Sequence, residues 1–206
     1  MAIDEYIHSF IRDNHPHLDK ISRQELDFTG RINPNVGEQV GRMLSFLIQL
    51  TAAKHVLEFG SSLGYSTVFL AAALQDTGGK LISVELNPLL AEITRQNLAQ
   101  AGLAEVGTVI TADAQAAAKS LSGPFDLILQ DSDKALYPQM IEDCARLLRV
   151  GGVLAADDTL FIPMGIPEKF SAPVHRHNQQ IFADPRFYST ILPIGDGLTI
   201  SVKINE

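Results

Sequence analysis

The chain has one cysteine, no tryptophan and no long apolar run. Because Cys144 stands alone, the chain can form neither an internal disulfide bond nor a cysteine-rich zinc site, and we expect a reducing environment, the cytoplasm. No stretch approaches the about 18 uninterrupted apolar residues of a membrane span. The start of the chain carries acidic side chains early and lacks the apolar core of a signal peptide. We therefore expect no membrane partner and no secretion signal.

Positive charge is also scarce. Lys and Arg number 16 against 24 Asp and Glu, which gives a formal net charge of -8. Binding to nucleic acid through a general surface needs clustered Lys and Arg, so we expect no nucleic-acid partner. The 206 residues are 46% hydrophobic, enough for an ordinary core, and they contain no internal repeat, low-complexity tract or linker. We expect a single domain over residues 1–206.

Short apolar runs rich in Val, Ile and Leu recur along the chain and predict buried strands. They lack strict polar–apolar alternation, which is typical of strands covered on both faces. Helical patterns lie between most of them; Asn87 and Pro88 open one helix that Gly102 closes, and a second begins near Pro138. Strands that alternate with helices predict an α/β fold with a parallel sheet. The expected parallel strands are residues 55–59, 81–85, 106–112, 125–130 and 152–156.

The two ends of the chain follow other patterns. Residues 187–194 and 198–204 flank the sequence Gly-Asp-Gly, which predicts an antiparallel hairpin near the C-terminus. Residues 1–50 have a mainly helical pattern, clearest over 38–50. We expect this N-terminal arm to precede a core formed by residues 51–206.

Each expected parallel strand ends in, or leads into, an acidic side chain. In an open α/β sheet, ligands bind at the carboxyl ends of the strands, so these acids should gather at one edge. They are Glu58, Glu85, Asp113, Asp131 and the adjacent pair Asp157 and Asp158.

The first strand leads into a loop with two glycines, Gly60 and Gly64. Their spacing, G-x-x-x-G, is neither the G-x-G-x-x-G of a dinucleotide fold nor a P-loop, and an ordinary strand-to-helix turn is the alternative. Glu58 would repel a pyrophosphate and favour a cationic ligand. Glu85 can accept both hydroxyls of a ribose, and Asp113 can accept an adenine amino group. A ribose, an adenine and a cation together describe S-adenosylmethionine.

Distinctive segments follow one another from about residue 35 to the C-terminus. They are "NVGEQVGRML" (35–44), "VLEFGSSLGYS" (56–66), "ISVELNP" (82–88), "FDLILQDSDKALY" (125–137), "LLRVGGVLAADDTL" (147–160) and "DPRFYSTILPIGDGLTIS" (184–201). Together they resemble the small metal-dependent O-methyltransferases related to catechol and caffeoyl-coenzyme A O-methyltransferases. The resemblance implies a Rossmann-like methyltransferase fold with a mostly parallel seven-stranded sheet, helices on both faces and a C-terminal antiparallel hairpin.

The same resemblance implies which residues bind S-adenosylmethionine. Glu85 would hold the ribose, and Asp113 with its neighbour Ala114 would meet the adenine. The remaining cofactor-binding residues, mostly around the methionine end, would come from the lid segment 35–44, the glycine loop and the end of the fourth strand. They are Val36, Gly37, Glu58, Gly60, Gly64, Ser66 and Asp131.

Asp131, Asp157 and Asp158 match the family's divalent-metal ligands, and Lys134 matches its catalytic lysine, with Asp131 beside it. Independently of the family, three carboxylates at two adjacent strand ends form a hard oxygen site that suits Mg²⁺, Mn²⁺ or Ca²⁺. Such an ion would lower the pKa of a hydroxyl on a catechol-like or phenolic acceptor. Lys134 could then take the proton, provided that its own pKa is lowered, or stabilise the phenolate.

Each of these residues alone also has a plainer interpretation. Asp131 could hydrogen-bond its own loop, Lys134 could be a solvated surface lysine, and Asp157 and Asp158 could be ordinary loop acids. Their placement at one edge of the sheet favours the metal site.

Several further residues have a weaker connection to the site. Tyr137 could reach the cofactor or cap the helix near Pro138, while Phe161 and Met164 could line the acceptor pocket or pack under the loop. We expect Asp133 to be structural.

Three polar residues of a predicted helix complete the set. His175 and His177 could bind a metal, but residues two apart on a helix face different ways, so we expect both at the surface. Asn178 lies in a polar stretch that the family uses near its site. The family usually has Asn where this chain has Asp158, followed by a tryptophan that this chain lacks. We therefore expect the loop 159–172 to differ in shape.

Two other functions are compatible with the pattern. One is a metal-independent methyltransferase whose carboxylates bind a substrate amine. The other is a non-catalytic S-adenosylmethionine-binding module, and Lys134 beside the acids favours catalysis over it. The resemblance, together with the apolar helix 38–50, also predicts a homodimer.

Overall fold

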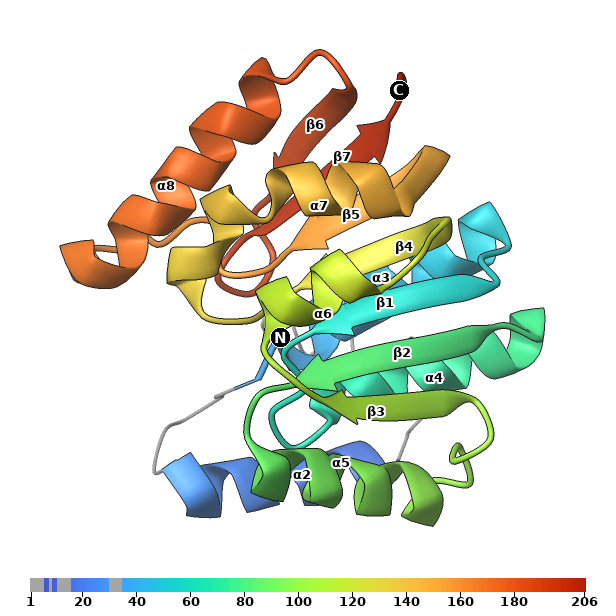
Figure 1. The fold of residues 1–206 in the computed structure, drawn as a ribbon. Coiled ribbons are helices and arrows are strands. Elements are labelled where there is room, and N and C mark those ends of the chain that lie inside the picture. The colour runs from blue at the N-terminus through green and yellow to red at the C-terminus, as the bar shows by residue number, and fades with distance from the viewer. Residues whose placement is uncertain (1–5, 8, 11–15, 30–34) are drawn as a thin grey trace.

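A computed structural model describes residues 6–7, 9–10, 16–29 and 35–206. Its centre is a seven-stranded sheet in the order β3-β2-β1-β4-β5-β7-β6, drawn in Figure 1. The strands from β3 to β5 run parallel, whereas β7 is antiparallel to both β5 and β6. The predicted α/β sheet with a C-terminal hairpin is confirmed. The strands are β1 (His55–Phe59), β2 (Lys80–Glu85), β3 (Gly107–Thr111), β4 (Phe125–Gln130), β5 (Leu148–Ala156), β6 (Phe187–Leu192) and β7 (Leu198–Lys203).

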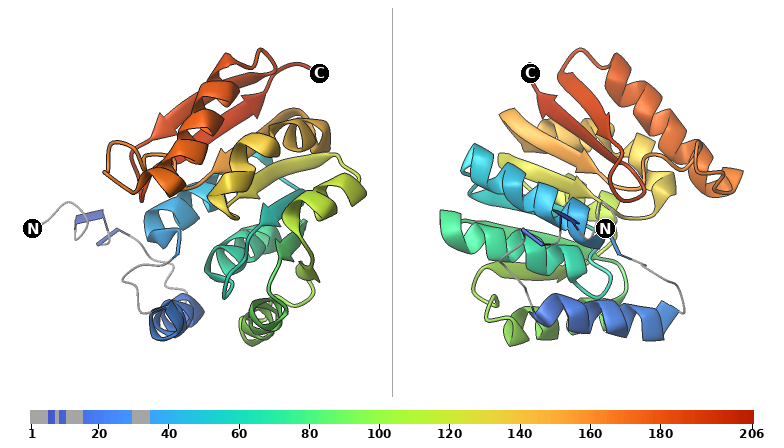
Figure 2. Two further views of the ribbon diagram at one scale, coloured as in Figure 1. Left: turned by 60° about the vertical axis from the view of Figure 1, so that its left-hand side comes forward. Right: turned by 180° about the vertical axis from the view of Figure 1, so that it is seen from behind.

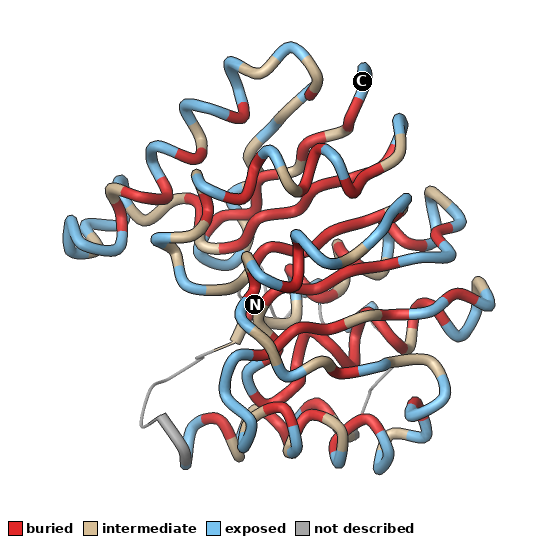
Figure 3. The backbone as a smooth tube through the Cα atoms, viewed as in Figure 1, coloured by how far each residue is buried: buried red, intermediate tan, exposed pale blue. Residues whose placement is uncertain are grey.

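Helices cover both faces of the sheet, as the two views of Figure 2 show. Alternate side chains of β1 enter the two resulting cores: Val56 packs with α3, α4 and α5, and Leu57 packs with α6, α7 and α8. The central strands β1 and β4 are buried along most of their length, whereas the outer strands β3 and β6 are more exposed (Figure 3). The helices are α2 (Pro16–Thr29), α3 (Gly37–Thr51), α4 (Tyr65–Thr77), α5 (Pro88–Gln100), α6 (Ala114–Ser120), the 3-10 helix η1 (Lys134–Gln139), α7 (Ile141–Leu147) and α8 (Glu168–Ala183).

The helix after β2 begins as its sequence predicts. The side chain of Asn87 accepts a hydrogen bond from Leu89 N at 2.9 Å, and Pro88 occupies the first helical position, where its missing N–H costs nothing. Within the N-terminal arm, α2, α3 and residues 6–7 are helical and residues 9–10 form a turn, whereas residues 1–5, 8, 11–15 and 30–34 lie outside the described residues. Among the described residues, no helix is long and apolar enough to cross a membrane.

The helix predicted near Pro138 is present, but its first residue is Ile141. Asp133 caps a 3-10 helix by accepting a hydrogen bond from Ala135 N, Pro138 lies inside that helix, and α7 begins only at Ile141. The local reason is the cap at Asp133, which starts the first turn earlier than the proline would. The expected structural role of Asp133 is thus a helix cap. The apolar residues beyond Pro138 are buried as core, Cys144 among them.

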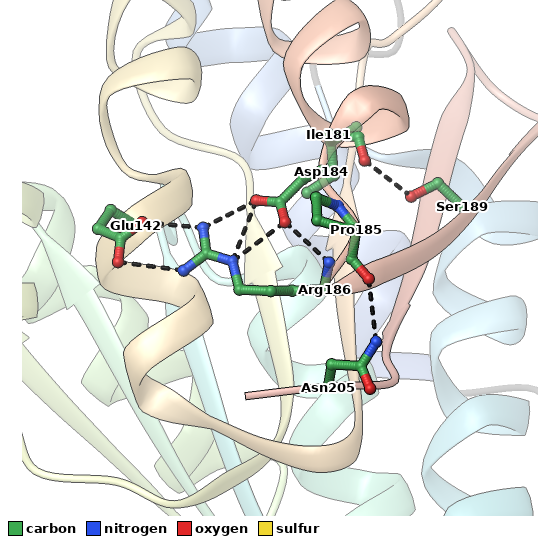
Figure 4. Close-up of polar contacts among 7 residues, drawn as sticks. All are labelled: Glu142, Ile181, Asp184, Pro185, Arg186, Ser189 and Asn205. Carbon is green, nitrogen blue, oxygen red and sulfur yellow. Dashed lines mark hydrogen bonds and ion pairs between the residues drawn. The ribbon is translucent and has the colours of Figure 1, made fainter.

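An ion-pair network lies at the edge of the sheet where the parallel strands begin (Figure 4). The guanidinium of Arg186 donates to both oxygens of Asp184 and to both oxygens of Glu142, so it joins the turn between α8 and β6 to α7. The amide of Asn205 donates to the carbonyl of Pro185 in the same turn. Strand β6 begins at this edge and ends beside the carboxyl ends of the parallel strands. The network therefore stabilises the fold at a distance from the edge where ligands bind.

Candidate active site

The carboxyl ends of the parallel strands border two cavities. One, of about 390 Å³, is lined by the glycine loop and the ends of β2 and β3; we call it the glycine-loop cavity. The other, of about 840 Å³, is bounded by Phe161, Ile166 and Phe170; we call it the aromatic cavity. The two cavities share residues 35–36, 131–134 and 158, so they meet at the ends of β4 and β5.

Glycine is required where the chain turns into the glycine-loop cavity. Gly60 has a φ of +93°, a conformation that favours glycine, and a side chain there would collide with the backbone carbonyl of Asp131. Gly64, with a φ of +95°, opens α4. The close approach of Gly60 to Asp131 brings the glycine loop against the end of β4.

Glu85 and Asp113 line the glycine-loop cavity as the sequence places them. Glu85 accepts backbone hydrogen bonds from Ser61 and Ser62 at 3.2 and 3.0 Å, and a third from Asn87 at 2.9 Å. A carboxylate has about four acceptor positions, so at least one remains for a ligand hydroxyl. Asp113 uses one oxygen to cap α6 and carries the chain into Ala114, which also lines the cavity.

Glu58 is enclosed more fully than the sequence suggests. It is completely buried, and its two oxygens accept hydrogen bonds of 2.5–2.6 Å from Ser66, Thr67 and Ser83. Burial raises the pKa of Glu58 to about 7, although these hydroxyls counteract the effect. Ser66 lines the glycine-loop cavity. A direct contact of Glu58 with the cofactor stays a prediction.

Three carboxylates meet where the two cavities join. Asp131, Asp157 and Asp158 each offer an oxygen within 4.8 Å of the others. Asp157 is buried, and its Oδ1 has no hydrogen-bond partner among the described residues. An unpaired buried carboxylate oxygen is costly, so these residues fit a divalent cation. Their role as metal ligands stays a prediction.

Lys134 neutralises part of this cluster. Its Nζ lies 2.8 Å from Asp131 Oδ1 and 2.7 Å from Asp158 Oδ2, and it donates to the hydroxyl of Tyr137 at 2.8 Å. Burial acts to lower the pKa of Lys134, but Asp131, Tyr137 and Asp158 outweigh it and raise the pKa well above its usual value. The lowered pKa that a proton acceptor needs is therefore absent in this arrangement, and Lys134 is a cation.

Tyr137 does not cap a helix, since it lies inside η1. It is fully buried, and its ring packs against the imidazole of His177 with centroids 5.5 Å apart. Its hydroxyl accepts the hydrogen bond from Lys134. Tyr137 thus holds the lysine from the side of the core.

The prediction that both histidines lie at the surface is right for His175 and wrong for His177. His177 stands three residues after Val174 and four before Ile181, so all three share the buried stripe of α8. Burial lowers the pKa of His177 to about 4, which keeps it neutral.

Three other residues were expected near the site, and one of them, Phe161, lines a cavity. Phe161 lines the aromatic cavity, whereas Met164 is exposed. Asn178 donates to the carbonyl of Thr159 and accepts from the hydroxyl of Thr199, so it ties α8 to the loop after β5 and to β7.

Sequence reasoning missed Glu25 and the side chain of Asn35. Both line the glycine-loop cavity, and Glu25 is only 1% exposed. A signal was present: Leu18, Ile21 and Glu25 are spaced as one face of a helix, so an acid stands on an apolar stripe. Glu25 does not belong to the pattern of acids at strand ends, because α2 lies outside the sheet.

Comparison with known proteins gives one consistent result. Residues 8–204 match the family model described as O-methyltransferase. Catechol O-methyltransferase of Niastella koreensis is 32% identical over 181 residues, which cover 82% of this chain and 81% of that protein. Caffeoyl-CoA O-methyltransferase 1 of Eucalyptus globulus is 30% identical, with 80% and 73% covered. An O-methyltransferase from Bacillus cereus, solved in complex with SAH (S-adenosylhomocysteine), has a TM-score of 0.83 at 27% identity and covers 98% of this chain and 97% of that one.

Proposed function

The chain belongs to the O-methyltransferase family, and we propose that it moves a methyl group from S-adenosylmethionine to a hydroxyl of a small phenolic acceptor with the help of a divalent cation. It is an S-adenosylmethionine-dependent O-methyltransferase of the caffeoyl-CoA and catechol type. The observation that carries the metal-dependent part is the meeting of Asp131, Asp157 and Asp158, beside Lys134, between the two cavities.

The glycine-loop cavity is assigned to S-adenosylmethionine. Glu85 would accept the ribose hydroxyls with its remaining acceptor capacity. Asp113 and the backbone of Ala114 would meet the adenine, since the first N–H groups of a helix have no partner within the helix. Ser66, Val36 and the backbone of Gly60 line the part of the cavity left for the methionine end.

The aromatic cavity is assigned to the acceptor. Phe161, Ile166 and Phe170 line this cavity with apolar surface that suits a flat ring. The carboxylate cluster and Lys134 stand between this cavity and the glycine-loop cavity. Two reactants held on either side of one cluster gain rate from positioning, which can contribute about 7–11 kcal/mol.

Asp131, Asp157 and Asp158 would hold the divalent cation, which supplies positive charge that lowers the pKa of an acceptor hydroxyl. Lys134 provides a second, fixed positive charge. The neighbouring carboxylates raise the pKa of Lys134 in the metal-free arrangement, which favours stabilisation of negative charge on the acceptor oxygen over removal of the proton.

The test is methylation of catechol with S-adenosylmethionine, with and without a chelator. We expect turnover with added Mg²⁺ and a loss of at least about 100-fold with EDTA, because the carboxylates would lose the charge that they hold in place. Restoration by excess Mg²⁺ is the control. Turnover that is unaffected by EDTA would contradict the metal and favour the metal-independent alternative. Binding of S-adenosylmethionine without turnover of any phenol would contradict the catalytic proposal.

We further propose that the enzyme is a homodimer and works in the cytoplasm. Phe46 and Leu50 are one turn apart on α3 and are 58% and 68% exposed, which suits a face that a second copy covers. Sedimentation should give a species of twice the 22.4 kDa chain mass, and Phe46→Glu should shift it toward the monomer. A monomer at all concentrations would contradict the dimer.

A further inference from the structure

Helix α2 sends one acidic side chain into the glycine-loop cavity. Glu25 is 1% exposed and lines this cavity together with Asn35 and Val36. An acid is almost never buried so deeply unless its carboxyl group has partners. Its contacts show what it holds.

The first contact is with Asn35, which precedes α3. The Nδ2 of Asn35 donates to Glu25 Oε2 at 2.7 Å and to the hydroxyl of Ser22, also on α2, at 3.2 Å. The Oδ1 of Asn35 accepts a hydrogen bond from Gly37 N at 3.0 Å. Asn35 therefore connects α2 with the start of α3, and residues 35–36 line both cavities.

The second contact is with the glycine loop. Glu25 accepts hydrogen bonds from the backbone of Leu63 and the side chain of Ser62. One carboxyl group thus joins α2, the segment 35–37 and the loop between β1 and α4. All three border the cavity assigned to S-adenosylmethionine.

We propose that Glu25 is a positioning residue that, through Asn35, holds the segment 35–37 over the cofactor and so sets the affinity for it. This inference rests on the proposed use of the glycine-loop cavity. Glutamine keeps one oxygen that can accept the hydrogen bond from Asn35 Nδ2, and the hydroxyl of Ser62 can turn to accept from the glutamine amide, so the link to Asn35 should survive this substitution. We therefore expect Glu25→Gln to preserve the affinity for the cofactor and Glu25→Ala to lower it.

The experiment is titration calorimetry with S-adenosylhomocysteine. We expect Glu25→Ala and Asn35→Ala each to weaken binding about tenfold, and the double variant to weaken it about tenfold rather than 100-fold, since both remove one link. Glu25→Gln should stay within about threefold of the parent chain. Asp27→Asn, an exposed acid on the same helix, is the control for charge and should bind normally.

A second measurement needs no ligand. Hydrogen exchange at Gly37 N–H, which bonds to Asn35, should be faster in Glu25→Ala and unchanged in Asp27→Asn. Additive losses in the double variant, normal binding by Glu25→Ala, or an equal loss in Glu25→Gln would overturn the proposal. If the parent chain itself fails to bind S-adenosylhomocysteine, the proposed function fails, while the exchange result still decides whether Glu25 holds the segment.

Discussion

Lys134→Met is expected to lower the turnover number for catechol about 100- to 10,000-fold, the range typical of a lost charge or proton-transfer group at a reacting atom. Lys134 is the cation that the structure places against Asp131 and Asp158, and the hydroxyl of Tyr137 orients it. Methionine keeps most of the length and volume of the side chain and removes the charge. The measurement is steady-state methylation at saturating S-adenosylmethionine and Mg²⁺.

Lys134→Met should also lower the stability of the protein, and added Mg²⁺ should show whether the lost positive charge is the reason. Without Lys134, the carboxylates face one another uncompensated, and removing one partner of a buried ion pair costs about 3–5 kcal/mol. We expect added Mg²⁺ to recover much of this loss in the variant. Lys119→Met, at an exposed position on α6, is the control and should change neither rate nor stability. Turnover within tenfold of the parent chain would contradict a catalytic role for Lys134.

The positions of the acids at the strand ends could be predicted from the sequence. Parallel strands end at one edge, so an acid after each strand must lie near the acid after its neighbour. Asp131 follows β4 and Asp157 follows β5, and these two strands are paired, which brings the cluster together. The bounds of β1, β2 and β4 follow the apolar runs to within one residue, because burial on both faces leaves these strands little polar surface. The fifth strand begins earlier than the predicted residue 152, at Leu148.

The environment of individual side chains could not be predicted in the same way. Whether Glu58 meets a ligand depends on three hydroxyls from α4 and β2 that enclose it. The burial of His177 depends on the rotation of α8, and the two-residue separation of His175 and His177 does not determine that rotation. Glu25 contacts the site only through the packing of an N-terminal helix. Helical spacing marks the positions of His177 and Glu25 as buried, but the groups that all three side chains contact are set by tertiary packing.

Asp157→Asn is expected to weaken Mg²⁺ binding at least about 100-fold, because a first ligand should matter no less than the supporting groups whose loss costs 10- to 100-fold. Asp157 carries the buried oxygen without a hydrogen-bond partner, so a bound cation would satisfy it. Without metal, the variant should be more stable than the parent chain, because burial and the neighbouring carboxylates raise the pKa of Asp157 and so make its charged form costly, whereas asparagine carries no charge. The measurements are titration calorimetry with Mg²⁺ and thermal unfolding with and without it.

Asp158→Asn is the matched comparison, since it changes the neighbouring acid in the same way. Asp158 is less buried and pairs with Lys134, and an asparagine oxygen can still bind a hard cation, so we expect a weakening of only about tenfold. The ion should then act more strongly on an acceptor hydroxyl, because fewer carboxylates oppose its charge. If Asp157→Asn and the parent chain gain the same stability from Mg²⁺, Asp157 is not a ligand. In that case the buried oxygen would need another partner, and the acids at the ends of β4 and β5 would be compensated by Lys134 alone.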